Sequence, residues 1–140
     1  EAAEELLLMY ITMRALQNRR ISFELIRVIF EMRLMLTEGE GLELFRCLRC
    51  GKEEVHSVYL SEGGLICREC AAKDKKLSKE YPIVLSADAK YTLQYILTST
   101  PEKLYAFTVT DSVLNELKRF MKSYLARYLP HKFKTLDFIV

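Results

Sequence analysis

The sequence predicts a mainly α-helical domain with an embedded zinc-ribbon-like β-hairpin, and two observations lead to that fold class. Apolar side chains recur at three- and four-residue steps, the spacing typical of amphipathic helices, and most clearly so in Asp111–Leu129. The four cysteines of the chain form two Cys-x-x-Cys pairs that are separated by sixteen residues. We therefore expect one helical domain over residues 1–140 that carries a metal-binding module at residues 47–70.

The cysteine spacing is that of a tetrahedral metal site made by Cys47, Cys50, Cys67 and Cys70. Each pair can form a tight turn with two thiolates directed at a common centre, and two such turns close a four-sulfur shell around one Zn²⁺. Because four thiolates saturate the ion, the site is expected to be structural and not catalytic. The alternatives are two disulfides, a redox pair, or a site in which His56 replaces one cysteine.

The residues between the two cysteine pairs favour a β-hairpin. Val55–Leu60 contains strand-forming side chains, Ser61–Gly64 has the composition of a turn, and Leu65–Ile66 leads directly into the second pair. Gly51 follows the first pair, where a left-handed residue can complete the metal-binding turn. The second pair is expected to open a short helix.

Four long helices and one short helix are predicted around this module. The first is apolar on nearly every side, so it is expected to be buried or to pack against something outside this chain. Ser22 and Ser86 are expected to cap the second and third helices, and Pro130 is expected to end the last. The predicted ranges are Ala2–Gln17, Phe23–Thr37, Ala87–Ser99, Thr100–Leu104 for the short helix, and Asp111–Leu129.

The charge distribution is more informative than the net charge of +2. Six basic residues and no acidic ones lie between positions 118 and 134. A basic helix face that continues into a basic tail is a candidate surface for nucleic acid or for an acidic peptide tail, although a solvated helix face is also common. The candidate binding residues are Lys118, Arg119, Lys122, Arg127, Lys132 and Lys134.

No arrangement of residues in the sequence indicates catalysis. His56 and His131 lie far apart with no obvious acidic or nucleophilic partner, and there is no phosphate-binding glycine loop. The longest apolar run, Leu6–Ile11, is far shorter than the ~20 residues needed to span a membrane. We therefore expect no enzyme and no membrane partner. Paired cysteines without a disulfide setting indicate a reducing compartment, the cytoplasm.

Several stretches, taken in this order along the chain, resemble the C-terminal region of the RecO family of bacterial DNA repair and recombination mediators. Phe23–Leu25 opens an apolar helix that is followed by a glycine-containing loop and Leu42–Cys47. Glu62–Cys70 is similar to the family's glycine-rich approach to its second cysteine pair. Tyr124–Leu129 and Lys132–Phe138 are similar to the family's ending. The cysteine module alone would not identify the family, whereas its combination with these helices does.

The resemblance implies a non-enzymatic role. It implies binding of single- and double-stranded DNA, annealing of complementary strands, cooperation with RecR, and loading of recombinase onto DNA coated by single-strand-binding protein. It also implies recognition of the acidic C-terminal tail of that protein by the helical domain, in a nucleoid-associated cytoplasmic setting. Family members carry an N-terminal OB-fold, and nothing in this sequence indicates that barrel. The chain is therefore expected to be a fragment that keeps the metal site and tail binding but has weak DNA affinity.

Two other classes of function remain open from the sequence. A zinc-stabilised protein-interaction domain without direct nucleic-acid binding would use the same cysteine module and helices. A zinc enzyme would need a coordination position open to water, which a shell of four cysteines does not provide.

Overall fold

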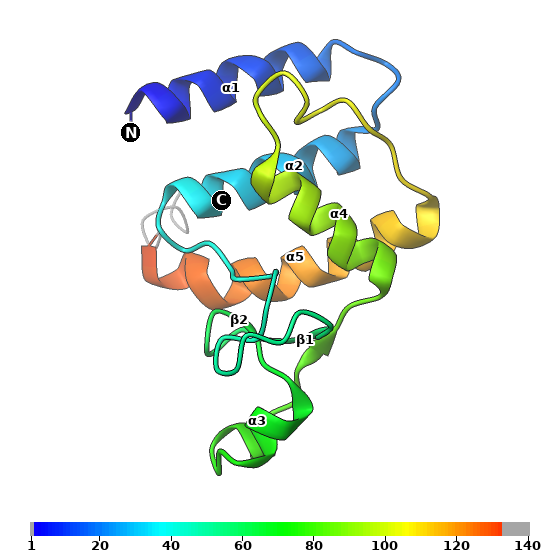
Figure 1. Cartoon of the computed structure of the whole chain (residues 1–140). Helices are drawn as coiled ribbons and strands as arrows, with labels where there is room; N and C mark the ends of the chain where they lie inside the picture. Colours follow the sequence, from blue (N-terminus) through cyan, green and yellow to red (C-terminus); the bar gives the residue numbers. More distant parts are fainter. Residues whose placement is uncertain (1, 133–140) are drawn as a thin grey trace.

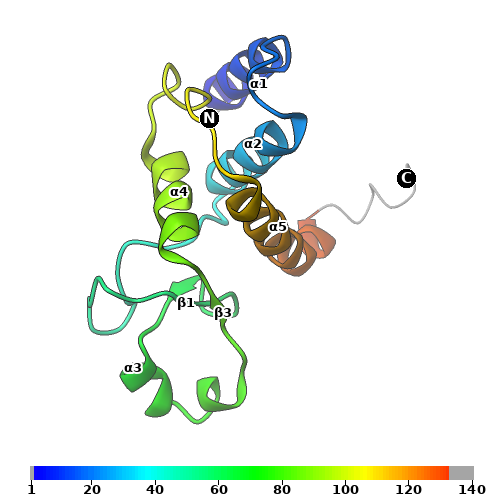
Figure 2. The same ribbon diagram turned by 90° about the vertical axis from the view of Figure 1, so that its right-hand side faces the viewer.

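The computed structural model describes residues 2–132, with side chains as far as residue 128. The long helices stack at one end of the molecule, and a small sheet with a short helix lies at the other end (Figures 1 and 2). The predicted fold class is confirmed. In chain order the elements are α1 (Ala2–Leu16), α2 (Phe23–Thr37), β1 (Ser57–Tyr59), β2 (Gly64–Leu65), α3 (Arg68–Ala72), the 3₁₀ helix η1 (Leu77–Lys79), β3 (Ile83–Val84), α4 (Ala87–Thr98) and α5 (Asp111–Lys132).

Helix α2 is the centre of the helical part, because α1, α4 and α5 all pack against it. Its residues Ile29 and Met32 are completely buried. The predicted caps are also present. The backbone N–H of Leu25 donates to Ser22 Oγ at 3.2 Å, and that of Ala89 donates to Ser86 Oγ at 3.1 Å. These bonds satisfy amide groups that have no partner inside the helix.

The predicted hairpin is present and forms part of a three-stranded antiparallel sheet with strand order β2-β1-β3. Val58 in the central strand pairs with Leu65 on one side and with Ile83 on the other. Of these strands, β3 (Ile83–Val84) is not among the elements that the sequence predicts. A two-residue strand is too short to show an alternating pattern, so β3 is defined by its pairing with β1 and not by its own sequence.

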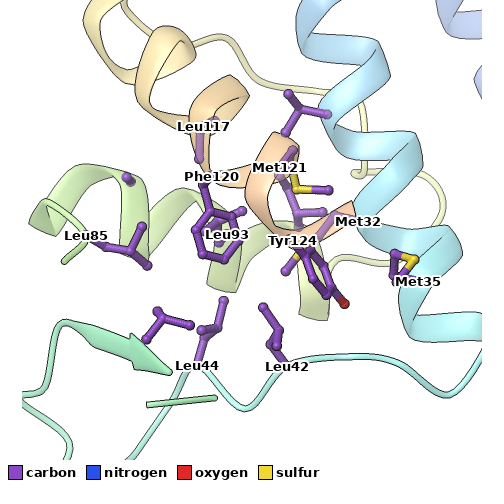
Figure 3. Packing of buried hydrophobic residues seen from close by; sticks show 14 of the residues in the cluster. Met32, Met35, Leu42, Leu44, Leu85, Leu93, Leu117, Phe120, Met121 and Tyr124 are labelled. Atoms are coloured by element: carbon purple, nitrogen blue, oxygen red, sulfur yellow. The ribbon is translucent and has the colours of Figure 1, made fainter. Parts of the chain in front are cut away.

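The main hydrophobic core lies where the helices meet the segment that leads into the cysteine module (Figure 3). Leu42 and Leu44 point from that segment toward Phe120 and Tyr124 of α5 and Leu93 of α4. All five side chains are buried. The core therefore joins the module to the helices directly, and the two parts share one hydrophobic cluster.

Two expectations were wrong, one about the short helix predicted at residues 100–104 and one about where the last helix ends. Residues 100–104 form turns, in which the N–H groups of Lys103 and Ala106 bond to carbonyls three residues back. The Tyr95 hydroxyl donates to the Lys103 carbonyl, which is then held by a tertiary contact. Helix α5 continues beyond Pro130 to Lys132. A proline removes one backbone donor, and here the two residues after it are still helical.

Helix α1 buries only a narrow stripe, formed by Leu8, Thr12 and Ala15. The hydroxyls of Thr12 and Tyr105 hydrogen-bond at 2.6 Å and join α1 to the loop before α5. The sequence had predicted either burial or an external partner, and in this chain most of the apolar surface of α1 is exposed. The large exposed apolar residues of α1 are Leu6, Leu7, Met9, Tyr10, Met13 and Leu16.

Among the described residues, no helix is both long and apolar enough to cross a membrane.

The packing of α2 generates a stability prediction. Met32→Ala should lower the free energy of unfolding by about 2–5 kcal/mol, because a fully buried side chain would leave a cavity between α2 and α5. Met13→Ala is the matched control, since Met13 is a helical methionine that is 63% exposed, and its cost should stay within about 0.5 kcal/mol. Urea unfolding of both variants measures the difference. Equal effects of the two substitutions would contradict the assigned core.

Candidate metal centre and basic helix face

The four cysteines converge on one point, with their sulfur atoms all within 4.8 Å of one another. Sulfurs bound tetrahedrally at about 2.3 Å from a zinc ion would lie about 3.8 Å apart. The Cys50 and Cys67 sulfurs are 3.6 Å apart, and all four cysteines are free thiols. The structure thus contains no disulfide among these residues, and the donor set fits a single thiophilic metal ion.

Backbone N–H groups hold two of the four sulfurs in place, those of Cys47 and Cys67. The backbone N–H groups of Arg49 and Cys67 donate to Cys47 Sγ at 3.4 and 3.3 Å, and Cys70 N–H donates to Cys67 Sγ at 3.5 Å. Gly51 has a φ of 79°, as expected for the residue that completes the first turn. Cys67 caps α3, so the predicted short helix opens at the second pair.

The close packing of the four cysteines shifts the pKa values of two of them in opposite directions. Burial raises the pKa of Cys47, but hydrogen bonds from Cys50, Cys67 and Arg49 outweigh it and lower the pKa to about 6. Hydrogen bonding with Cys67, followed by burial and the neighbouring Cys50 and Cys47, raises the pKa of Cys70 to about 12. One thiolate therefore forms readily while another is suppressed. A bound divalent cation would allow all four to ionise together.

His56 does not belong to this cluster, so the alternative in which it replaces a cysteine is not supported. Its Nδ1 atom is buried and has no hydrogen-bond partner among the described residues. Its carbonyl accepts a hydrogen bond from Leu85 N–H at 2.9 Å, next to the pairing of β1 with β3. We assign it no ligand role.

Arg49 is a structural residue of the module that sequence reasoning missed. It lies between Cys47 and Cys50, and its guanidinium contacts Glu62 in the hairpin turn and Asp74 after α3, each at 2.9 Å. The hydrogen bond from Arg49, with help from the N–H groups of Lys76 and Leu77, lowers the pKa of Asp74. The sequence shows the charge of Arg49, but its two partners are known only from the fold.

The predicted basic residues of α5 divide into paired and unpaired groups. The Lys118 ammonium lies 3.0 Å from a carboxylate oxygen of Glu24 on α2. Arg119, Lys122 and Arg127 are exposed and form no ion pair within the described part of the chain. Lys132 belongs to α5, but its side chain is outside the described atoms, and Lys134 lies outside the described residues. The role of these residues in binding stays a prediction.

The metal centre leads to a test by metal removal. Chelation should lower the melting temperature of the protein by about 10 °C or more, since losing a structural metal costs on the order of 3 kcal/mol or more. Cys67→Ser removes one ligand and should produce a similar loss. Chelator should then have no further effect on that variant, which serves as the control. Metal analysis and thermal unfolding under reducing conditions provide the readouts, and a wild-type protein without metal would contradict the assignment.

Comparisons with known proteins identify the family. The family model described as "Recombination protein O C terminal" matches residues 2–137. The chain is 34% identical over 122 residues to the DNA repair protein RecO of Acetivibrio thermocellus, an alignment that covers 86% of this chain and 46% of that protein. For the DNA repair protein RecO of Desulforamulus reducens the identity is 29% over 113 residues, covering 79% and 42%. For that of Clostridium kluyveri it is 27% over 129 residues, covering 89% and 46%.

No solved structure matches the chain. The chain spans less than half the length of these three curated relatives. The family model nevertheless covers every described residue, including the cysteine module and all of the described helices. The chain belongs to the RecO family, in the part that the family model describes as its C terminus.

Proposed function

We propose that the chain is the zinc-stabilised helical part of a DNA repair and recombination mediator. In this role it binds DNA, supports annealing of complementary strands and helps to load recombinase onto DNA coated by single-strand-binding protein. Membership in the RecO family and the names of the relatives support a role in DNA repair. The observation on which the proposal depends is the set of exposed, unpaired cations on α5. The protein acts in the cytoplasm, at the nucleoid.

Zinc is the metal that the donor set favours. Soft thiolate ligands select zinc over magnesium or calcium, which prefer oxygen ligands. A complete shell of four sulfurs leaves no position for water or substrate, so the ion stabilises the fold and performs no chemistry. This supports a non-enzymatic role. The ion would be held by Cys47, Cys50, Cys67 and Cys70.

DNA binding is supported by Arg119, Lys122 and Arg127 on α5. None of the three forms an ion pair with a carboxylate in the described part of the chain, so phosphates can replace the small ions around them and gain affinity through counterion release. Lys118 contributes less in this interpretation, because Glu24 already pairs with it. Phosphate contacts of this kind do not depend on sequence, which suits a protein that acts on any damaged DNA.

A second surface supports recognition of the acidic tail of single-strand-binding protein. A cavity of about 670 Å³ lies between α1 and the loop at residues 101–106. Its apolar lining includes Ile11, Ala15 and Ile21, and Tyr10 and Tyr105 add aromatic surface. The Arg14 guanidinium lies in the same lining and donates to the Tyr10 hydroxyl at 3.1 Å. An aromatic end residue can enter the apolar part while its carboxylate pairs with Arg14.

RecR completes the proposed set of partners. The chain spans under half of its relatives, so the surface for RecR is proposed for the intact protein and is not assigned to residues here. A zinc-stabilised interaction domain without nucleic-acid contact is the competing function, because the tail pocket alone would serve it.

Charge reversal on α5 tests the DNA-binding role. In the intact protein, Arg119→Glu together with Lys122→Glu should weaken binding of single strands and duplexes. The slope of log K against log salt should become less steep by about 0.7 per lost phosphate contact for single strands. The control is Arg19→Glu with Lys103→Glu, which changes the net charge equally at exposed sites away from α5. A wild-type protein that binds no DNA even at low salt would favour the competing function.

Substitution of Arg14 tests the tail pocket. Arg14→Glu should weaken the binding of an acidic peptide that ends in phenylalanine by about tenfold or more, since a charge-assisted contact becomes a repulsion. Arg20→Glu, an exposed charge outside the pocket lining, should leave that affinity nearly unchanged. Fluorescence anisotropy with the labelled peptide measures both. If a peptide without phenylalanine binds equally well, the apolar pocket is not the site.

A further inference from the structure

A trough runs along α5 on the side that faces the metal module. Two cavities, of about 520 and 210 Å³, lie along this side of the helix. Both are lined by Ile83 of β3 and Ser123 of α5, so the two cavities are neighbours along the helix, and together they are called the trough. One wall is α5 and the other is the chain from Lys76 to Leu85 together with the hairpin.

Cations lie on both walls of this trough. Arg127 lines the larger cavity and Arg119 the smaller one. These two residues are eight positions apart on α5, so they lie on the same face of the helix, about 12 Å apart along its axis. Lys76 lies on the opposite wall. None of the three forms an ion pair with another described residue, so all three remain available to an anionic ligand.

The two carboxylates in the lining, those of Glu80 and Glu116, both accept hydrogen bonds from serine residues. Both oxygens of Glu116 accept hydrogen bonds from Ser86, from its N–H at 2.8 Å and from its hydroxyl at 2.7 Å. Glu80 accepts a hydrogen bond from the Ser61 hydroxyl at 2.7 Å. These contacts hold the acidic groups in structural roles at the cap of α4 and at the hairpin turn. Three cations face two carboxylates, so the lining keeps a net positive charge of one, which is complementary to a phosphate backbone.

An aromatic ring stands at the edge of the same trough. Tyr81 lines the larger cavity, yet it is 97% exposed. The next residue is Pro82, and a proline restricts the backbone conformation of the residue that precedes it, here Tyr81. A fully exposed aromatic side chain beside two cations contributes little to the core, and it has the form of a stacking platform for an unpaired base.

We propose that this trough holds a short stretch of single-stranded nucleic acid, with phosphates at Arg119, Arg127 and Lys76 and a base stacked on Tyr81. The proposal rests on the DNA-binding function proposed above and gives it a path and a strand preference. The larger cavity, of about 520 Å³, has the size of a site for a small organic ligand, which is room for a nucleotide or two. Stacking on Tyr81 requires a base that is not paired, as it is in a strand awaiting annealing.

The module and α5 are held together at this trough by a direct contact. The Tyr128 hydroxyl of α5 donates to the Leu60 carbonyl of the hairpin at 2.8 Å. One wall of the trough therefore belongs to the metal-stabilised part of the chain, and the other belongs to the helical part. Removal of the metal should displace the first wall and weaken single-strand binding, even while α5 remains helical.

The test measures binding of a labelled oligothymidine and of a matched duplex to the intact protein. Tyr81→Ala should weaken single-strand binding by on the order of tenfold, whereas Tyr81→Phe should keep wild-type affinity because the ring remains. Tyr91→Ala is the matched control, since Tyr91 is also exposed, at 69%, but lies on α4 outside the trough lining. Duplex affinity should not change with Tyr81→Ala.

The charges are tested separately from the ring. Lys76→Gln with Arg127→Gln should make the salt dependence of single-strand binding less steep by about 0.7 for each residue, whereas Tyr81→Ala should leave the slope unchanged. Circular dichroism and metal content establish that each variant is folded. If one variant fails to fold, the other still tests the trough.

Several outcomes would overturn the trough as a strand site. Unchanged single-strand affinity in Tyr81→Ala, or an unchanged slope in the charge variant, would do so while wild-type binding still supports the general DNA-binding function. Equal losses for strand and duplex would show a duplex site. Loss of acidic-peptide binding alone in the charge variant would show a peptide site. A wild-type protein that binds no DNA would instead remove the proposed function itself.

Discussion

The convergence of four sulfur atoms within 4.8 Å is the constraint on which the rest of this structure depends. Four thiolates at that separation would repel one another, so a bound divalent cation would stabilise the fully ionised cluster. The two metal-binding turns in turn fix Leu42 and Leu44 under the helices, where both are buried against α5 and α4. A bound ion would therefore influence the fold beyond its own ligands, because the cysteine module sets where the hairpin and the chain after α3 lie relative to the surface of α5.

The helical part and the module meet through a few long-range contacts of different chemistry. The buried apolar cluster supplies non-directional stabilisation, whereas polar contacts fix the relative position of the elements. The buried Tyr124 hydroxyl donates to the Glu40 carbonyl, Gln94 donates to the Leu44 carbonyl at 2.8 Å, and the Lys90 ammonium donates to the Glu53 carbonyl at 2.8 Å. Each joins a helix to the segments around the first cysteine pair. Backbone carbonyls that no sheet or helix satisfies are thus satisfied by side chains from α4 and α5.

The features that the sequence could predict are those set by neighbouring residues. Cysteine spacing determines the metal centre, and Ser22 and Ser86 determine where two helices begin. The features it missed depend on partners far along the chain. Ile83 is a strand residue only because Val58 pairs with it, and Lys118 is neutralised by Glu24, which lies 94 positions away. The sequence could not predict that Tyr81 and Arg127 line the same cavity, because the path of the chain into β3 brings them there. Residues 100–104 carry a helix-start pattern, yet tertiary contacts of Tyr95 and the burial of Leu104 hold them as turns.

The position of the module between α2 and α4 also has a consequence for the order in which the chain folds. Residues 38–86 form a long connection between two helices that pack against each other. The entropy lost in closing such a loop has to be compensated before the contacts between α2 and α4 contribute any stability. Metal binding by the two cysteine pairs would close the shorter loop between them. The ion would thereby divide one long closure into smaller steps, and assembly of the helices would then depend on metal supply.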